Sequence, residues 1–157
     1  MTLLQRRPYT ELVVPAWVNS VPEFADRVGG ICATTLPDNS TWGASGFILA
    51  GSELGGRDSV YLPQKDVVVQ LDFYAGTTGS GKPLWNVAAS LCEAVIAACE
   101  DESNMRRHLT LSVRGKSFGT VMVHEFYPIS PMTKDIRDSA QYAHYFMDFR
   151  VCWLRLS

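Results

Sequence analysis

The run Gly76–Lys82 reads Gly-Thr-Thr-Gly-Ser-Gly-Lys and matches the first seven positions of a phosphate-binding P-loop. In a P-loop the next residue is Ser or Thr, whose hydroxyl holds magnesium and whose backbone N–H helps line the phosphate nest. Here that residue is Pro83, which has neither group. The preceding strand also carries Gln70 and Asp72 on its wetter face, whereas a P-loop strand is normally buried on both faces. We therefore interpret residues 76–82 as a flexible loop ahead of a helix, with nucleotide binding as the alternative.

Other residues of the types that catalyse reactions or bind metals are not spaced as an active site or a metal site requires. The segment Gly43–Gly46 falls short of the Gly-x-Ser-x-Gly nucleophile elbow, and no His or acid is spaced to serve Ser45. The three histidines, His108, His124 and His144, occupy separate segments and are expected to be hydrogen-bonded residues of strands or loops. The sequence therefore predicts no catalytic residue, no cofactor-binding residue and no metal ligand.

The cysteines and one acidic pair support the same conclusion. Irregular spacing favours reduced, buried thiols over a disulfide framework or a zinc site at Cys32, Cys92, Cys99 and Cys152. Asp135 and Asp138, close to Arg137, predict a polar turn rather than a sheltered carboxylate pair.

Length and composition indicate one globular domain over residues 1–157. Of the 157 residues, 46% are hydrophobic and 19% are charged, which suits a packed core and excludes wholesale disorder. The formal net charge is −2 and like charges form no block, so neither sequence-specific nor dominant nucleic-acid binding is expected. No stretch approaches the ~20 apolar residues that cross a bilayer, and the first seven residues lack a secretion signal. We expect no membrane partner and assembly in a cytoplasm.

Two helices are expected. Thr10 can cap an N-terminal helix, and Pro15 is expected to distort or end it. Its apolar residues cluster on one side at Leu12, Val13, Ala16 and Trp17. A longer helix is predicted to run from Pro83 to about Glu100, because its apolar residues recur at spacings of three and four.

The remaining pattern predicts strands. A short strand at Phe47–Ala50 is followed by a hairpin or loop extension near 51–65, and Asp66–Ala75 alternates between a drier and a wetter face. Further strands are predicted at Leu109–Val113 and Thr120–Tyr127, with a break at Pro128–Pro131.

The predicted last strand, Gln141–Leu156, is apolar on both faces, which places it in the middle of a sheet or at a subunit contact. We predict an α+β domain with an antiparallel or mixed sheet of about four to five strands, on which one long helix and an N-terminal helix pack.

This layout resembles the tail terminator and neck-protein families of long-tailed bacteriophages. The similarity covers about three quarters of the chain and consists of patterns without invariant catalytic residues. The matching stretches are Asp26-Arg27-Val28, Leu36-Pro37, Phe47–Gly51, Val67–Tyr74, Leu84–Cys99 and Tyr145–Leu156. The resemblance implies a non-enzymatic virion protein of the tail or neck. Such a subunit forms a ring, expected to be a homohexamer, that stops growth of the tail tube and contacts the tail tube protein and the head-tail connector protein.

A closed ring needs two different patches on each subunit that meet head to tail. One candidate is the last strand, which is apolar on both faces, and the other is the extended segment after the first strand. The residues that we predict for these patches are Arg57, Asp58, Tyr61, Leu62, Phe146 and Arg150. The open alternative is that the last strand is merely central in the sheet and that the extension is a mobile hairpin.

Overall fold

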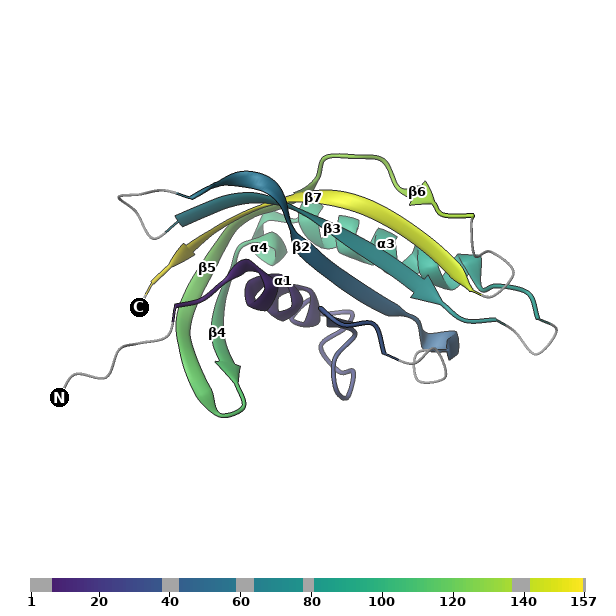
Figure 1. The fold of residues 1–157 in the computed structure, drawn as a ribbon, viewed down its shortest axis with the longest axis horizontal. Coiled ribbons are helices and arrows are strands. Elements are labelled where there is room, and N and C mark those ends of the chain that lie inside the picture. The colour runs from purple at the N-terminus through teal and green to yellow at the C-terminus, as the bar shows by residue number, and fades with distance from the viewer. Residues whose placement is uncertain (1–6, 38–42, 59–63, 78–80, 137–141, 157) are drawn as a thin grey trace.

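Figure 1 shows a strongly curved sheet with helices packed against it in a computed structural model of the protein. The structure describes residues 7–37, 43–58, 64–77, 81–136 and 142–156. Its helical elements are α1 (Thr10–Asn19), the 3-10 turn η1 (Gly43–Ser45), α3 (Trp85–Glu100) and α4 (Glu102–Met105). Its strands are β1 (Cys32–Ala33), β2 (Phe47–Asp58), β3 (Gln64–Ala75), β4 (Arg107–Val113), β5 (Lys116–Pro128), β6 (Thr133–Lys134) and β7 (Ala143–Arg155). The fold is α+β, as predicted.

Strand β7 lies in the middle of the sheet, whose order is β1-β2-β3-β7-β5-β4. One side of β7 pairs with β3 along its whole length, from Gln64↔Leu154 to Ala75↔Ala143. The other side pairs with β6 near the start of β7, at Tyr145 and Phe146, and with β5 over the rest of the strand, from Phe149 to Arg155. β5 ends at Pro128, which has no N–H to continue a ladder. The predicted central position of this strand is confirmed.

Both long helices cover the same face of the sheet. The side chains of β3 and β7 that face the helices are buried, among them Leu71, Phe73 and Phe149. They form one hydrophobic core with residues of α1 and α3. α3 contributes Leu91 and Val95, whose spacing of four places them on one side of the helix. The predicted long helix is therefore confirmed, with its first residue at Trp85.

Helix α1 fills the curve between the two ends of the sheet and contacts β1, β2 and β4. Trp17 is fully buried and stacks on Phe126 of β5, with ring centroids 3.8 Å apart. The indole Nε1 of Trp17 donates a hydrogen bond of 2.7 Å to the carbonyl of Met105. The helix passes through Pro15 and continues to Asn19, so an end at Pro15 is wrong. Burial of Trp17 after the proline stabilises the last turn.

The sheet has more strands than the four to five that the sequence predicts, because seven lie in the described residues. Two of the additional strands, β1 and β6, contain only two residues each and are too short to produce a pattern. β2 is also longer than the predicted strand at Phe47–Ala50. It continues to Asp58 through register shifts between Ala50 and Gly55, which keep the Gly-rich stretch paired with β3. In the predicted extension near 51–65, residues 51–58 therefore belong to β2 and residues 64–65 to β3. Residues 59–63 lie outside the described residues.

Candidate functional site

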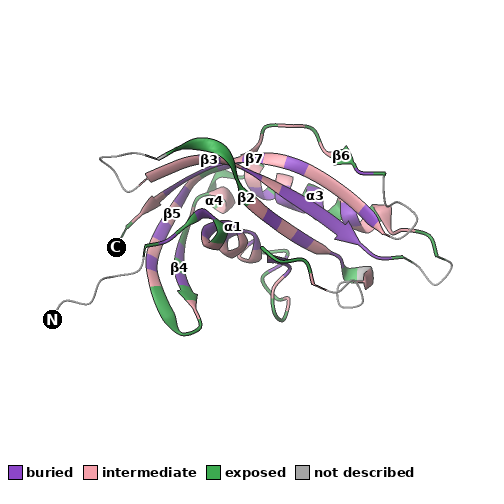
Figure 2. Cartoon of the chain, in the orientation of Figure 1, coloured by how far each residue is buried: buried purple, intermediate pink, exposed green. Residues whose placement is uncertain are grey.

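The face of the sheet opposite the helices carries a second row of partly buried side chains. In β7 this row includes Phe146, Asp148 and Arg150, and in β3 it includes Val68 and Gln70. No helix of the described residues lies across it (Figure 2). We call this face the outer face. Because residues such as Phe146 and Arg150 remain partly exposed on this face, it is available for contact with another protein.

Two of the predicted interface residues, Arg57 and Arg150, come together on the outer face. The guanidinium of Arg150 donates from Nε to Oδ1 of Asp66 over 2.7 Å and from Nη2 to Oδ2 of the same carboxylate. These hydrogen bonds, followed by the charges of Arg150 and Arg57, lower the pKa of Asp66. With Val68 and Ile129 these residues line a hollow of about 330 Å³. The hollow combines apolar side chains with a cation-rich rim.

The other predicted interface residues are separate from this hollow or are not described. Phe146 lies farther along β7, where it faces Thr133 of β6 and is partly buried. Asp58 ends β2, but its side chain is not described. Tyr61 and Leu62 lie outside the described residues. The six residues therefore do not form one continuous site among the described atoms.

A hydrogen-bonded cluster around His144 was missed by the sequence analysis. Nε2 of His144 lies 2.7 Å from Oδ1 of Asp72, and its Nδ1 lies 3.4 Å from Oδ2 of Asp135. The ring of Tyr74 stacks on the imidazole at 4.2 Å. The amide of Gln70 donates to Asp72 over 3.1 Å. This cluster fixes the segment that contains Asp135 against β3 and β7.

The predicted polar turn combined Asp135 with Asp138 and Arg137, and the last two lie outside the described residues. Asp135 itself is only 9% exposed, so the prediction that this residue lacks a sheltered position is wrong. The sequence analysis missed its contact with His144 because the strand order was unknown, and only that order brings β6 beside β7. The two carboxylates lie at opposite nitrogens of the imidazole and do not converge on one point. Within the described ranges no three His, Cys, Asp or Glu side chains are placed to hold a metal ion.

The loop with the P-loop-like sequence is closed by backbone contacts at both ends. Thr77 and Pro83 form an antiparallel bridge, and the N–H of Leu84 donates to the carbonyl of Gly76 over 2.9 Å. α3 begins at Trp85, so Lys82 precedes the helix and is exposed. Strand β3 is antiparallel to both of its neighbours. These features differ from a P-loop, whose strand belongs to a parallel sheet and whose lysine lies at the start of the helix.

The thiols are largely removed from solvent. Cys32, Cys92 and Cys152 are buried, as predicted, and Cys99 is partly buried. Burial raises the pKa of Cys92 and of Cys99 to about 12. These groups are therefore protonated and weakly nucleophilic at neutral pH.

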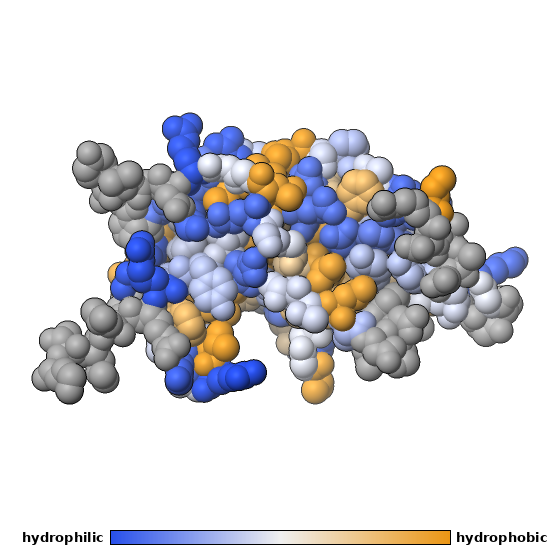
Figure 3. All heavy atoms as spheres, in the orientation of Figure 1, coloured by the Kyte–Doolittle hydropathy of each residue, from blue (hydrophilic) through white to orange (hydrophobic). Residues whose placement is uncertain are grey.

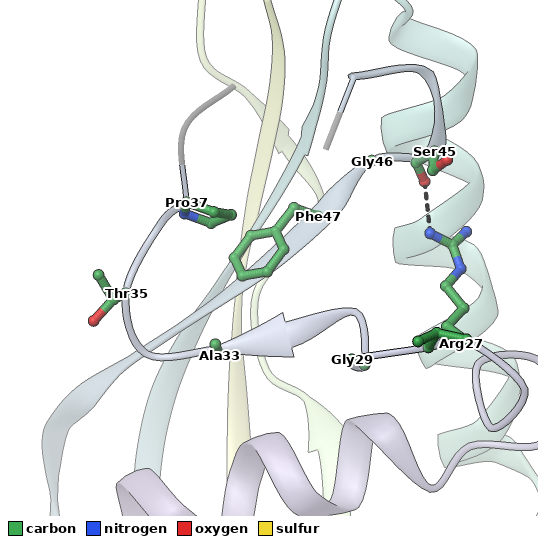
Figure 4. A pocket seen from close by; sticks show the side chains of 10 residues that line it. Arg27, Gly29, Ala33, Thr35, Pro37, Ser45, Gly46 and Phe47 are labelled. Carbon is green, nitrogen blue, oxygen red and sulfur yellow. Dashed lines mark hydrogen bonds between the residues drawn. The ribbon is translucent and has the colours of Figure 1, made fainter. Parts of the chain in front are cut away.

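A larger hollow of about 730 Å³ lies beside the start of β2 (Figure 4). Phe47, Ala33 and Pro37 provide its apolar walls. Nη1 of Arg27 donates to the carbonyl of Ser45 over 3.0 Å at one end. Three stretches on which the family resemblance rests, at 26–28, 36–37 and 47–51, contribute residues to this one hollow. Sequence reasoning identified the stretches but gave no sign that they are neighbours.

Hydrophobic residues do not form a single large patch on the side of the molecule seen in Figure 3, where they gather in small separate groups. Large apolar side chains that are exposed include Val28, Leu54, Ile129 and Ile136. Mixed surfaces of this kind are typical of protein–protein interfaces, which as a whole are only about as apolar as the remaining surface.

Comparison with protein-family models, with curated proteins and with solved structures found no match for this chain. Among the described residues, no helix has the length and apolar character needed to span a bilayer.

Proposed function

We propose that this protein is a structural assembly protein of a long-tailed bacteriophage that forms a ring, caps the finished tail tube and joins it to the head connector. In this role the protein catalyses no reaction and requires no cofactor. Its work is done by surfaces that bind other copies of the chain, the tail tube protein and the connector protein. The location that follows is the tail or neck of the virion, after assembly in the host cytoplasm.

The observation that carries this proposal is the presence of two different candidate surfaces on one subunit. The first is the outer face around Phe146 and Arg150, over which no helix of the described residues packs. The second is the second half of β2, where Ser52–Arg57 are all exposed. Because the two surfaces differ, they are suited to a head-to-tail contact, and contacts of that kind close into a ring when the rotations between neighbouring subunits add up to a full turn.

The proposal is tested by mixing the purified protein with the tail tube protein of the same phage. We expect native mass spectrometry to detect a homo-oligomer, alone or on addition of tube protein, and electron microscopy to detect tubes that stop growing with a ring at one end. A protein that remains monomeric in both conditions and leaves tube length unchanged would contradict the proposal.

The alternative function is nucleotide binding by the loop at 76–82, which the strand–loop–helix order of β3 and α3 favours. Thermal unfolding with and without Mg-ATP or Mg-GTP separates the two functions, because a ligand that binds the native state raises its unfolding midpoint. We expect no change in midpoint. A rise that Lys82→Ala abolishes would support the nucleotide site instead.

A further inference from the structure

We propose that His144, together with Asp72 and Asp135, forms a latch that depends on protonation. The latch holds residues 133–136 against the sheet while the imidazole carries two N–H groups, and it loosens them when the ring loses a proton. We call residues 133–136 the strap, because β6 and the two residues after it run beside β7 (Figure 1). The latch belongs to a single subunit and does not depend on the proposed function.

The imidazole of His144 lies between two carboxylates from different parts of the chain. Its Nε2 is 2.7 Å from Oδ1 of Asp72 in β3, and its Nδ1 is 3.4 Å from Oδ2 of Asp135 in the strap. Only 12% of the side chain of His144 and of Asp72 is exposed, and only 8% of that of Asp135. Both ring nitrogens therefore face an acid at a position with little water to replace a missing donor.

Both carboxylates find an N–H on the ring only while the ring is protonated. A neutral imidazole has one N–H and one lone pair, whereas an imidazolium has two N–H groups. In the neutral ring, one carboxylate faces a lone pair, and the two electron-rich groups repel each other. Histidine changes between these forms roughly between pH 5 and 8. The contact is therefore complete at the acid end of this range and is lost as the pH rises and the ring gives up its proton.

Loss of the proton should release Asp135 and not Asp72. Asp72 is the nearer of the two to the ring, and it also accepts a hydrogen bond of 3.1 Å from the amide of Gln70. Its strand, β3, is paired on both sides. On the strap, the pairing of β6 with β7 covers two residues, and the N–H of Asp135 donates to the carbonyl of His144 over 2.9 Å. Because segments with few backbone hydrogen bonds open at a low cost in free energy, the strap is the part that moves.

The other groups that pack around the imidazole are aromatic rings. They are Tyr74, whose ring centroid is 4.2 Å from that of the imidazole, Tyr142, which packs edge-on against Tyr74, and Phe146, at 6.1 Å. Farther along the same row of β7, Asp148 is a further acid, and Arg150 is paired with Asp66. Among these groups, the cation that faces both Asp72 and Asp135 is therefore the protonated ring itself.

The strap covers an aromatic surface at the start of α3. Nζ of Lys134 lies 4.2 Å from the ring centroid of Trp85 and 5.9 Å from that of Tyr145. These two rings meet edge to face, with centroids 5.5 Å apart. The strap also pairs with β7 at Tyr145 and Phe146. Loosening of the strap uncovers the ring of Trp85 and this edge of β7, so the proton on His144 controls access to both.

A spin label on the strap tests the latch. Ile136→Cys places the label at an exposed position next to Asp135, and the electron paramagnetic resonance spectrum measures how freely the strap moves. We expect a largely immobilised spectrum at pH 5.5 and a shift to a more mobile one at pH 8.5. The chain without Ile136→Cys, labelled in parallel, gives the contribution of the native thiols, of which Cys99 is only partly buried.

Asp135→Asn, made in the labelled chain, separates the latch from other effects of pH. The new amide can accept a hydrogen bond from a protonated ring and donate one to the lone pair of a neutral ring. The strap should therefore stay immobilised at both pH values in this variant.

His124→Gln is the matched control. His124 is also a partly buried histidine, but the residues on either side of it pair with the opposite end of β7, at Trp153 and Cys152. This variant should keep the change in the spectrum between pH 5.5 and pH 8.5. Circular dichroism at both pH values checks that each variant is folded.

Three results would overturn the latch. One is a folded Ile136→Cys chain whose spectrum is the same at both pH values. Another is a change of equal size in Asp135→Asn, which would place its origin outside the contact with His144. The third is loss of the change in His124→Gln. None of these results bears on ring formation, which the mass measurements with tail tube protein test separately.

Discussion

At the scale of single residues, Arg107 joins the end of α1 to the segment formed by α4 and the start of β4, which is far from it in sequence. Its guanidinium donates to the carbonyl of Ser20 after α1 and to the carbonyl of Asn104 in α4. It also lies 5.6 Å from the ring centroid of Trp17. Burial lowers its pKa, yet an arginine remains charged at neutral pH. Arg107 thus fixes the end of α1 against the start of β4.

Trp17 is expected to be one of the residues on which folding depends most. Trp17→Ala removes a fully buried ring that stacks on Phe126, and we expect a loss of about 3–5 kcal/mol in the free energy of unfolding. Trp17→Phe retains much of the apolar contact but leaves the carbonyl of Met105 without its donor, so the loss should be smaller. Urea denaturation of both variants measures the difference. Equal losses would show that ring volume contributes little at this position.

The ion pair between Asp66 and Arg150 predicts a dependence of stability on pH. The hydrogen bond from Arg150 lowers the pKa of Asp66 below its ordinary value of 3.8. The stabilisation is therefore present above pH 4 and is lost as the pH falls through the lowered pKa. Arg150→Gln removes it, and since both side chains are partly exposed the effect at pH 7 should be small.

Thermal unfolding of the native protein and of Arg150→Gln at pH 7 and pH 2.5 checks this expectation. The midpoints should differ at pH 7 and draw together toward pH 2.5, as the lowered pKa of Asp66 is approached and the carboxylate takes up a proton. A difference of the same size at both values would contradict an electrostatic origin.

Residue patterns in the sequence indicate which side chains face outward but not which ones become neighbours. Alternation within β7 predicts the positions of Phe146 and Arg150 on one face, and the structure places them there. The cluster of His144 with Asp72 and Asp135 depends on the pairing of β7 with β3, which is distant in sequence, and with β6. The hollow beside Phe47 likewise combines segments that local spacing does not show to be neighbours.

At the scale of elements, the turns at the ends of β2 and β3 require glycine for two different reasons. Gly46 and Gly81 have nearly the same positive φ, +79° and +81°. A Cβ on Gly46 would lie 2.6 Å from Cδ1 of Leu91 and 2.8 Å from the carbonyl oxygen of Tyr74, whereas nothing lies within 4 Å of a Cβ on Gly81. Gly46 is therefore restricted by space as well as by backbone conformation.

Substitution by alanine separates these two effects. Gly81→Ala should lower the free energy of unfolding by about 1–2 kcal/mol, the penalty of the left-handed conformation alone. Gly46→Ala should add about 1–3 kcal/mol for the displacement of α3 from the sheet. Chemical denaturation of the two variants provides the comparison. If they were equally stable, the close approach of Leu91 would have no energetic consequence.

Element prediction succeeded where one periodicity extends over many residues. The spacing in α3 and the alternation in β3 and β7 predict their type and approximate bounds. It failed for the second half of β2, because Gly51, Gly55 and Gly56 indicate turns when pairing is unknown. Bulges opposite β3 allow these glycines to remain in the strand, and that is a tertiary effect.

At the scale of the whole molecule, the outer face allows a prediction about assembly. Phe146→Ser removes a partly buried ring from the outer face, so we expect the free energy of unfolding of the subunit to fall by only about 1 kcal/mol. Binding to the ring neighbour or to the tail tube protein should be clearly lost. Phe146→Leu should preserve binding. Sedimentation with tube protein measures binding, and thermal unfolding measures the stability of the subunit. If Phe146→Ser bound as the native protein does, this part of the outer face would not belong to the assembly surface.

The central position of β7 has a consequence for the order in which the chain acquires its structure. β3 and β5 both precede in the chain the strand that lies between them, so each lacks this neighbour until residues 143–155 have been synthesised. Pairings between such distant residues slow folding and leave unpaired edges exposed to aggregation. The sheet therefore closes in a late step, and copies of the chain acquire a complete surface for one another only after translation has passed that strand.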